Sequence, residues 1–342
     1  TEPYAFNEEA STDNKTHIVM SWLLGKATDL EASMEAHLLC SILLDNSASP
    51  LQKALETTEL GTSPSPLCGL DDSQKELCFV CGIEGTEPDR AEALEKLVLG
   101  VLRDVADNGI PQEQVEASLH QLELQQREIG GDSYPYGLQL ILTSLTSATH
   151  RGDPIALLNL DPVLEKLRGN IQDPNYIKQL ARNLLLDNQH RVRLTMTPDT
   201  ELAGKRDQAE ADKLAAIKST LSDEEKQALI EKAQTLNERQ QQKDDESILP
   251  KVGLEDIPPK MAYVAATEKH QKPLPLTTYA TGTNGLVYQQ VILPLPSLTE
   301  QQIHLLPIFT IPSERNCMYD LQFDSYSALF LDIMATLDDA QP

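Results

Sequence analysis

Apolar and amphipathic stretches alternate along the N-terminal part of the chain, and each has the length of one structural element. Two continuous apolar runs, residues 17–25 and 76–85, predict buried strands. A third stretch, residues 190–198, alternates polar and apolar positions, as a strand with one solvent-exposed face does. The pattern therefore predicts three long strands that are far apart in the sequence.

Between these strands, apolar residues recur every third or fourth position, which predicts helices that bury one face. Residues 136–149 are apolar on more sides, so we expect that helix to be buried. Groups of helices between strands predict an α+β domain over residues 16–198, with helices packed on a mostly antiparallel sheet. The predicted helices span residues 30–45, 50–61, 89–107, 111–129, 136–149, 161–168 and 173–186.

The composition changes after residue 200, where Lys, Glu, Gln and Ala dominate. Ser222 and Glu225 form a capping box, which marks a helix start. We predict that residues 199–250 form a connecting hairpin of two antiparallel helices, with its turn near residues 219–222. A narrow apolar stripe is expected to be buried between them: Leu214, Ile217, Leu221, Leu229, Ile230 and Leu236.

Two stretches flank these units. Residues 251–342 predict the start of a further α+β domain, with strands at 261–266 and 285–294 and a helix at 299–309. This stretch is too short for a second copy of the first domain, so we expect it to be incomplete. Residues 1–15 are interpreted as an N-terminal extension, which lacks the basic start and apolar stretch of a signal peptide.

The chain is strongly acidic, with 53 Asp and Glu against 28 Lys and Arg in 342 residues, a formal net charge of −25. This charge repels phosphate backbones, which argues against nucleic acid as a partner, and it attracts basic peptides. Apolar residues make up 40%, enough for a core, yet no apolar run has the length of a membrane helix, so no membrane partner is expected. Five cysteines, an odd and sparse set, favour the cytoplasm or an organelle matrix.

The histidines do not predict a metal site. Neither H-E-x-x-H nor H-x-x-E-H occurs, and Glu35 and His37 lie roughly 200° apart around a helix, too far to share a metal. We therefore assign no catalytic, cofactor-binding or metal-binding residue. The seven histidines are His17, His37, His120, His150, His190, His270 and His304.

Other short motifs are interpreted as structural. Cys78 and Cys81 match C-x-x-C, but they lie in a predicted strand, where residues three apart face opposite sides, so we interpret them as buried structural cysteines. Residues 130–131 and 282–285 are turn signals, the latter suited to a hairpin, and residues 244–246 are a solvated acidic helix end. The chain contains neither a nucleophile elbow nor a phosphate-binding glycine loop.

Four segments, in order, resemble the presequence protease branch of the pitrilysin/insulinase-type zinc metallopeptidases. The resemblance extends from about residue 16 to about residue 309 and includes the charged hairpin. Residues 311–317 depart from it by breaking the expected helix, and residues 318–342 do not match. The segments are SPLQKAL at 49–55, CGLDDS at 68–73, PKVGLEDIP at 250–258 and TNGLVY at 283–288.

The resemblance implies an enzyme of four homologous α+β domains, in which two halves close as a clamshell around unfolded peptides. Residues 16–198 would be its second domain, residues 199–250 the hairpin, and the rest the start of the third. The family's H-x-x-E-H motif belongs to the first domain, so zinc is expected there and no ligand is transferred to this chain. The helix with Glu35 and His37 would be a degenerate counterpart of the zinc-bearing helix.

These points lead to one main hypothesis and two alternatives. The chain is a non-catalytic section of a zinc-dependent oligopeptidase, inactive alone, that contributes chamber wall, peptide binding and a hinge; its partners are unfolded or basic peptides and the remaining domains of the enzyme. Alternatively, it is a stand-alone peptide-binding or scaffold protein without chemistry. A cysteine-dependent hydrolase would require a reactive Cys68 or Cys81, and the sequence places no His to activate either thiol.

Overall fold

The structure is a computed structural model. It describes residues 1–7, 10–129, 135–251, 253–257, 259–260, 263–270, 275–290, 292, 297–300 and 302–304.

One twisted sheet organises the first two hundred or so residues, in the strand order β1-β6-β2-β5-β3, with the short β4 also paired to β5. The long strands β2 and β5 pair antiparallel with Met20 opposite Cys81, and β2 pairs antiparallel with β6 on its other side. Only β1 runs parallel to its neighbour, β6. The strands are β1 Glu2–Ala5, β2 Thr16–Lys26, β3 Ser63–Pro64, β4 Gly69–Asp71, β5 Glu76–Thr86 and β6 Arg191–Asp199.

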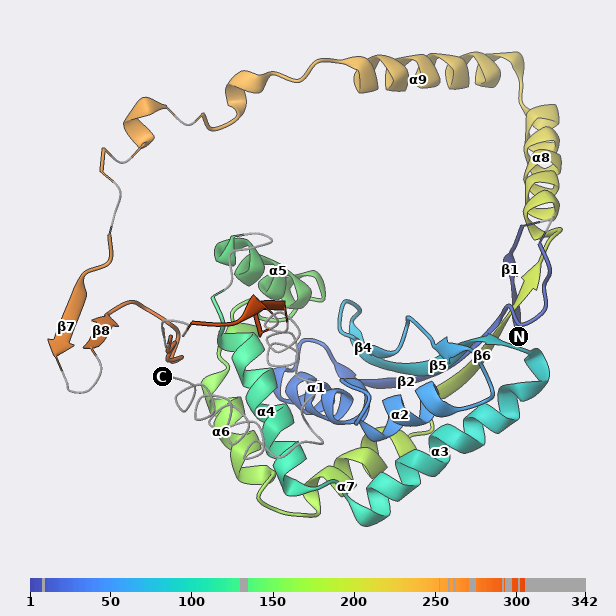
Figure 1. The fold of residues 1–342 in the computed structure, drawn as a ribbon. Coiled ribbons are helices and arrows are strands. Elements are labelled where there is room, and N and C mark those ends of the chain that lie inside the picture. Colours follow the sequence, from blue (N-terminus) through green and yellow to red (C-terminus); the bar gives the residue numbers. More distant parts are fainter. Residues whose placement is uncertain are drawn as a thin grey trace.

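Helices follow the strands and cover one face of this sheet (Figure 1). Pro111 stands immediately before α4, and Pro50 opens α2, where its missing N–H is harmless. The helices of this part are α1 Leu30–Leu44, α2 Pro50–Thr57, α3 Ala91–Asn108, α4 Gln112–Arg127, α5 Tyr136–Thr149, α6 Asp161–Asn170 and α7 Tyr176–Leu180, the last continued by a π-helical segment, Ala181–Leu186. The α+β fold class predicted from the sequence is confirmed.

The core lies between the sheet and α1 to α3. Every second residue of β2 points into it, and the indole of Trp22 is fully buried, with Nε1 donating to the carbonyl of Leu185 over 2.8 Å. Leu38 of α1 and Val98 of α3 are likewise fully buried in this cluster. The opposite face of the sheet carries Leu23 and Val192, which are exposed, because no helix covers them.

Three local features differ from the sequence prediction. Residues 2–5, placed in an extension, add the edge strand β1 to the sheet. The loop predicted at 62–69 contains the short strands β3 and β4. Helix α5 forms as expected but is not buried: Leu138, Ile141, Leu142 and Leu145 are exposed, and Ser147 is its one buried residue. Apolar content alone does not distinguish a buried helix from one whose apolar face has no partner in the chain.

Helices α8, Leu202–Thr220, and α9, Asp223–Gln241, form with the predicted capping box, in which the Ser222 hydroxyl accepts from the Glu225 amide over 3.2 Å. Neither helix has a buried residue, and they run in different directions instead of packing side by side (Figure 1). The prediction of an apolar stripe buried between two antiparallel helices is therefore wrong. The two-residue connection between them leaves Leu214 and Leu229 in solvent.

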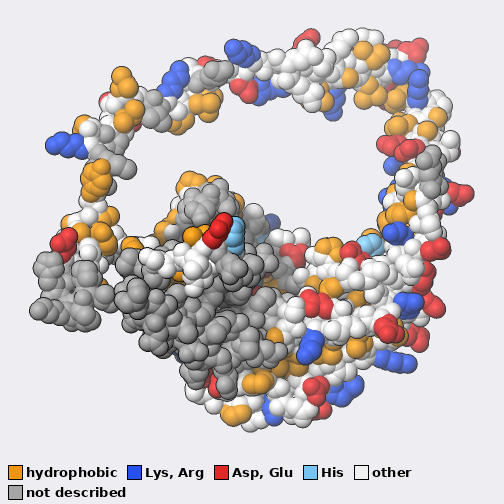
Figure 2. Space-filling model, viewed as in Figure 1, with side chains coloured by type: hydrophobic (Ala, Val, Ile, Leu, Met, Phe, Trp, Pro, Cys, Tyr) orange, Lys and Arg blue, Asp and Glu red, His pale blue; other side chains and the backbone are white. Residues whose placement is uncertain are grey.

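The chain beyond α9 returns toward the first domain. Strands β7, Ala266–His270, and β8, Pro275–Tyr279, pair antiparallel. We call α8, α9 and the β7–β8 pair the arch, because together they curve away from the sheet and back to the region of α4 and α5, leaving an open window (Figures 1 and 2).

The strands predicted in this region are mostly wrong within the described residues. Residues 263–265 and 286–290 have no regular structure, because a strand requires a paired neighbour and these segments have none among the residues described. Of the helix predicted at 299–309, residues 300 and 302–304 are helical. The rest of that helix and the segments 311–317 and 318–342 lie outside the described residues, and the domain boundaries stay predictions.

None of the helices in the described part of the chain is both long and apolar enough to cross a bilayer.

Candidate functional site

Helix α1 is the natural place to look for chemistry, because it follows the first long strand and carries both Glu35 and His37. Asp29 caps its N-terminus by accepting from the Ala32 amide over 3.2 Å. Its apolar face, which includes Met34 and Leu38, is buried against the sheet. Its polar side chains are thereby turned toward α4, α6, α7 and the segment before β5.

Glu35 and Glu31 connect α1 to the helices beside it. The Tyr176 hydroxyl of α7 donates to Glu35 Oε1 over 2.7 Å, and Lys166 of α6 pairs with Glu31. Burial, together with the bond to Glu35, raises the pKa of Tyr176. Both carboxylates thus have partners that hold helices together, which is a structural role.

His37 faces a different neighbour. Its Nε2 lies 3.3 Å from Oδ2 of Asp72, in the turn between β4 and β5. The hydrogen bond to His37 lowers the pKa of Asp72, so this carboxylate is charged at neutral pH. The histidine therefore ties α1 to the β4–β5 turn, while Glu35, two residues earlier, bonds to α7.

This arrangement does not fit zinc. A catalytic zinc needs three protein ligands that converge on one point. Glu35 and His37 have separate partners, and within the described residues no group of three or more His, Cys, Asp or Glu side chains is placed to hold a metal ion.

Two hollows adjoin α1, and His37 borders both. The larger, of about 280 Å³, lies between α1, α4 and α5, and it is lined by apolar residues such as Met34 and Leu142 together with His37 and Asp72. The smaller, of about 190 Å³, is bordered by His37, Cys40 and Gln121. Sequence reasoning missed Asp72, because nothing local to residue 72 signals a partner 35 positions earlier.

The cysteines are placed as poor nucleophiles. Cys81 is fully buried in the core, whereas Cys78 is half-buried, with its Sγ 2.8 Å from the Ser21 hydroxyl. Burial raises the pKa of Cys81 and of Cys68, and burial with the nearby Asp45 raises that of Cys40 to about 12. These thiols are protonated at neutral pH, so the geometry gives no support to a cysteine hydrolase.

A charged network joins α4 to α6. Glu123 accepts from Arg127 Nε over 2.7 Å and also pairs with Arg168, while Arg127 pairs with Asp161. Burial alone would raise the pKa of Glu123, but the bonds from Arg168 and Arg127 outweigh it and lower the pKa. The Glu–Arg spacing of four residues is the sequence signal by which part of this network could have been found.

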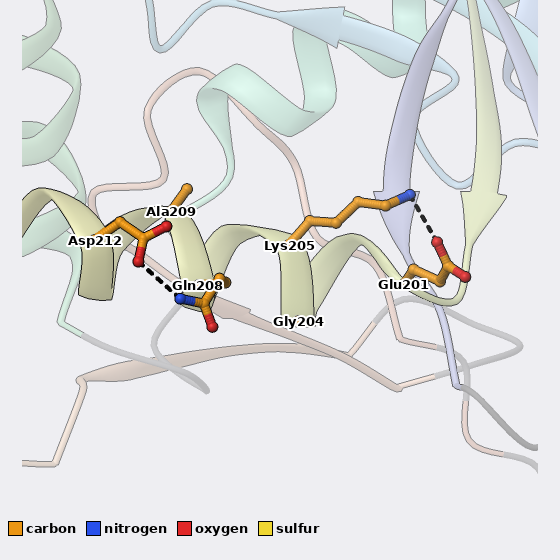
Figure 3. Close-up of a pocket in the computed structure, with 6 residues that line it drawn as sticks. All are labelled: Glu201, Gly204, Lys205, Gln208, Ala209 and Asp212. Atoms are coloured by element: carbon orange, nitrogen blue, oxygen red, sulfur yellow. Dashed lines mark hydrogen bonds and ion pairs between the residues drawn. The ribbon is translucent and has the colours of Figure 1, made fainter.

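A further depression runs along α8, beside Glu201, Gly204 and Ala209. Figure 3 shows its polar side chains paired with one another: Lys205 Nζ lies 3.0 Å from Glu201, and Gln208 donates to Asp212 over 2.8 Å. These are contacts along an exposed helix, and they provide no nucleophile or base.

Two family models match the chain. Residues 2–122 match the model described as "Peptidase M16 inactive domain". Residues 196–313 match the model of the region associated with subfamily C of the same M16 peptidases.

Curated relatives agree. The mitochondrial presequence protease of Xenopus tropicalis is 30% identical over 298 residues, which is 87% of this chain and 29% of that protein. The chloroplastic/mitochondrial presequence protease 1 of Arabidopsis thaliana is 28% identical over 90% of this chain and 29% of that protein, and Protein HypA of Clostridium perfringens is 27% identical over 88% and 31%. The chain thus spans under a third of the length of these relatives.

Solved structures include the M16 inactive domain of Pseudomonas fluorescens, 17% identical, with a TM-score of 0.38 over 58% of this chain and 43% of that one. A protease of Helicobacter pylori is 12% identical, with a TM-score of 0.37 over 57% and 44%.

The sequence matches and the geometry of α1 lead to the same conclusion. Along the chain, a domain of the inactive type precedes the region associated with subfamily C. The chain is therefore a non-catalytic, presequence-protease-like section of an M16 peptidase.

Proposed function

We propose that this chain forms part of the wall of a peptide-degrading chamber, where it binds peptides that another domain of the same enzyme cuts. The observation that carries the proposal is an M16 inactive domain in which Glu35 and His37 of α1 have separate structural partners. Zinc would be held by the domain that carries H-x-x-E-H, and the remaining domains of the enzyme are the chain's first partners.

The open face of the sheet is the proposed peptide-binding surface. Helices cover its other face, so Leu23 and Val192 remain exposed beside His17, whose Nδ1 lies 3.6 Å from Glu84. The short strands β3 and β4 leave the edge of the sheet beyond β5 incompletely paired, and an extended peptide can add to such an edge through its backbone.

The charge of the chain favours basic peptides. Its net charge of −25 attracts cations, although acidic and basic side chains are intermixed on the face in Figure 2 instead of forming one patch. The attraction is therefore a long-range property that added salt will weaken. The relatives named above are mitochondrial or chloroplastic, which supports an organelle matrix as the compartment.

The test measures binding and cutting separately on this chain. A fluorescent basic peptide should bind, an acidic peptide of equal length should bind far more weakly, and raising salt from 50 to 300 mM, a range of roughly twofold in screening length, should weaken the basic peptide. The peptide should stay intact, and metal analysis should find no stoichiometric zinc. Stoichiometric zinc with chelator-sensitive cleavage would overturn the proposal.

Matched variants locate the surface. Val192→Lys adds a positive charge to the open sheet face, and Leu214→Lys adds the same charge to the arch; both positions are exposed. We expect the first variant to weaken binding of the basic peptide and the second to leave it near the wild-type value. Equal effects would mean that the sheet face is not the site. Absence of peptide binding in every case would favour the scaffold alternative.

A further inference from the structure

The turn Thr283–Leu286 has a conformation of its own. The Leu286 amide donates to the Thr283 carbonyl over 3.0 Å, and the Thr283 hydroxyl donates to the Leu286 carbonyl over 2.5 Å. Asn284 and Gly285 have φ of 51° and 84°, the left-handed region that Asn and Gly tolerate best. The Asn-Gly pair therefore specifies this turn locally.

The turn contacts the C-terminal end of α4, 157 residues earlier. Asn284 Nδ2 donates to the Arg127 carbonyl over 3.1 Å, and Arg127 Nη1 lies 3.5 Å from the Asn284 carbonyl and donates to it. The last carbonyls of a helix have no partner within it, so an amide side chain that reaches one supplies a missing donor. The two residues are thus bonded in both directions.

The partner of the turn is held in place before the turn arrives. Arg127 pairs with Glu123 and Asp161, and the side chains of Arg127 and Glu123 are each 16% exposed. An arginine already fixed by two carboxylates loses little conformational entropy when it accepts a third contact. The end of α4 is therefore a preorganised receptor for the turn.

The other end of the arch is also attached. Asp199, the last residue of β6, accepts from the Phe6 amide over 3.1 Å and lies 3.3 Å from Lys205 of α8. Between these two attachments, α8 and α9 have no buried residue. The turn is thus placed where it can decide whether the arch is tied back to the first domain.

We propose that the Asn284–Gly285 turn is a latch, which docks on Arg127 and holds the arch closed against the first domain. Release of this turn frees the arch to move about its attachment at β6. The proposal is independent of the peptide-binding surface, because it requires no ligand.

The experiment uses the full chain and three variants. Asn284→Gly removes the amide but keeps a residue that accepts positive φ, Arg127→Gln removes the guanidinium, and Arg168→Gln is the matched control, because it breaks a bond to the same Glu123 without contacting the turn. Hydrogen exchange of the Leu286 amide reports the turn, and small-angle X-ray scattering reports how far the arch extends.

We expect Asn284→Gly and Arg127→Gln to speed exchange at Leu286 by about fivefold or more, the effect of losing one net hydrogen bond, and to increase the radius of gyration. Arg168→Gln should change neither. The double variant Asn284→Gly/Arg127→Gln should match the stronger single variant, because both remove the same docking. Unchanged exchange and scattering in the first two variants, or an equal response in the control, would overturn the latch.

Discussion

Single residues set how closely the central strands approach each other. Gly82 of β5 lies opposite Val19 of β2, and a Cβ built on it would stand 2.2 Å from the Ile18 carbonyl oxygen and 2.7 Å from Val19 Cα. These are backbone atoms of a paired strand, which cannot move aside without disturbing the ladder. A glycine at this position is therefore a packing requirement.

We expect Gly82→Ala to lower the free energy of unfolding by about 1–3 kcal/mol, the usual cost of overpacking, as measured by urea denaturation. Gly100→Ala is the matched control: it lies within α3 with open space around the added Cβ. It should raise the free energy of unfolding by about 0.5–1 kcal/mol, because alanine loses less entropy in a helix than glycine. A neutral Gly82→Ala would mean that β2 and β5 are less closely paired than described.

At the scale of elements, the carboxylate of Glu123 joins α4 to α6 through Arg127 and Arg168. Its pKa is lowered in the folded chain, so it binds a proton less readily there than in the unfolded chain. Its contribution to stability is therefore fully present above the ordinary Glu pKa of about 4.3, and it is lost as the pH falls through the lowered folded value.

Glu123→Gln should accordingly cost about 1–3 kcal/mol at pH 7, the range for hydrogen bonds to charged groups. The difference from the wild type in urea denaturation should shrink at about pH 3.5, where the wild-type carboxylate becomes protonated in both states. Glu210→Gln, on exposed α8, serves as the control and should be near neutral at both values. A difference that stays constant with pH would show that the charge of Glu123 is not what stabilises the contact.

At the scale of the whole molecule, the chain divides into a packed body and an arch. The body contains the buried cluster of β2, β5 and α1 to α4, whereas α8 and α9 expose every side chain for which burial is described, apart from the partly covered Leu202 and Lys226. Segments with few buried contacts open locally at low free-energy cost, and proteases cut where the backbone opens.

Limited trypsin digestion should therefore cut first within the arch, at lysines such as Lys213, Lys218 and Lys232, and leave the body intact for longer. Mass spectrometry of the earliest fragments would identify the sites. The lysines of the body, such as Lys96 on α3, provide the internal comparison. First cuts in α3 or α4 would contradict the division.

The elements themselves could be predicted from the sequence. Local periodicity identified β2, β5, β6, α1, α3 and α4 almost to the residue, because alternation and the three-to-four spacing record which side of an element meets the core. Four short segments also indicated the family. The candidate residues Glu35 and His37 were located, as was the Asn-Gly turn.

What could not be predicted depends on contacts between residues far apart in the chain. Strand β1 exists because β6 is available to pair with it, the partners Asp72 and Tyr176 are supplied by other elements, and Arg127 is bonded to Asn284 across the molecule. The exposure of α5, α8 and α9 likewise depends on what lies beside them. The sequence by itself determined which segments become helix or strand, since that is decided within a few neighbouring residues; only the tertiary structure decided which of their faces are covered, because covering requires a partner that local pattern does not name.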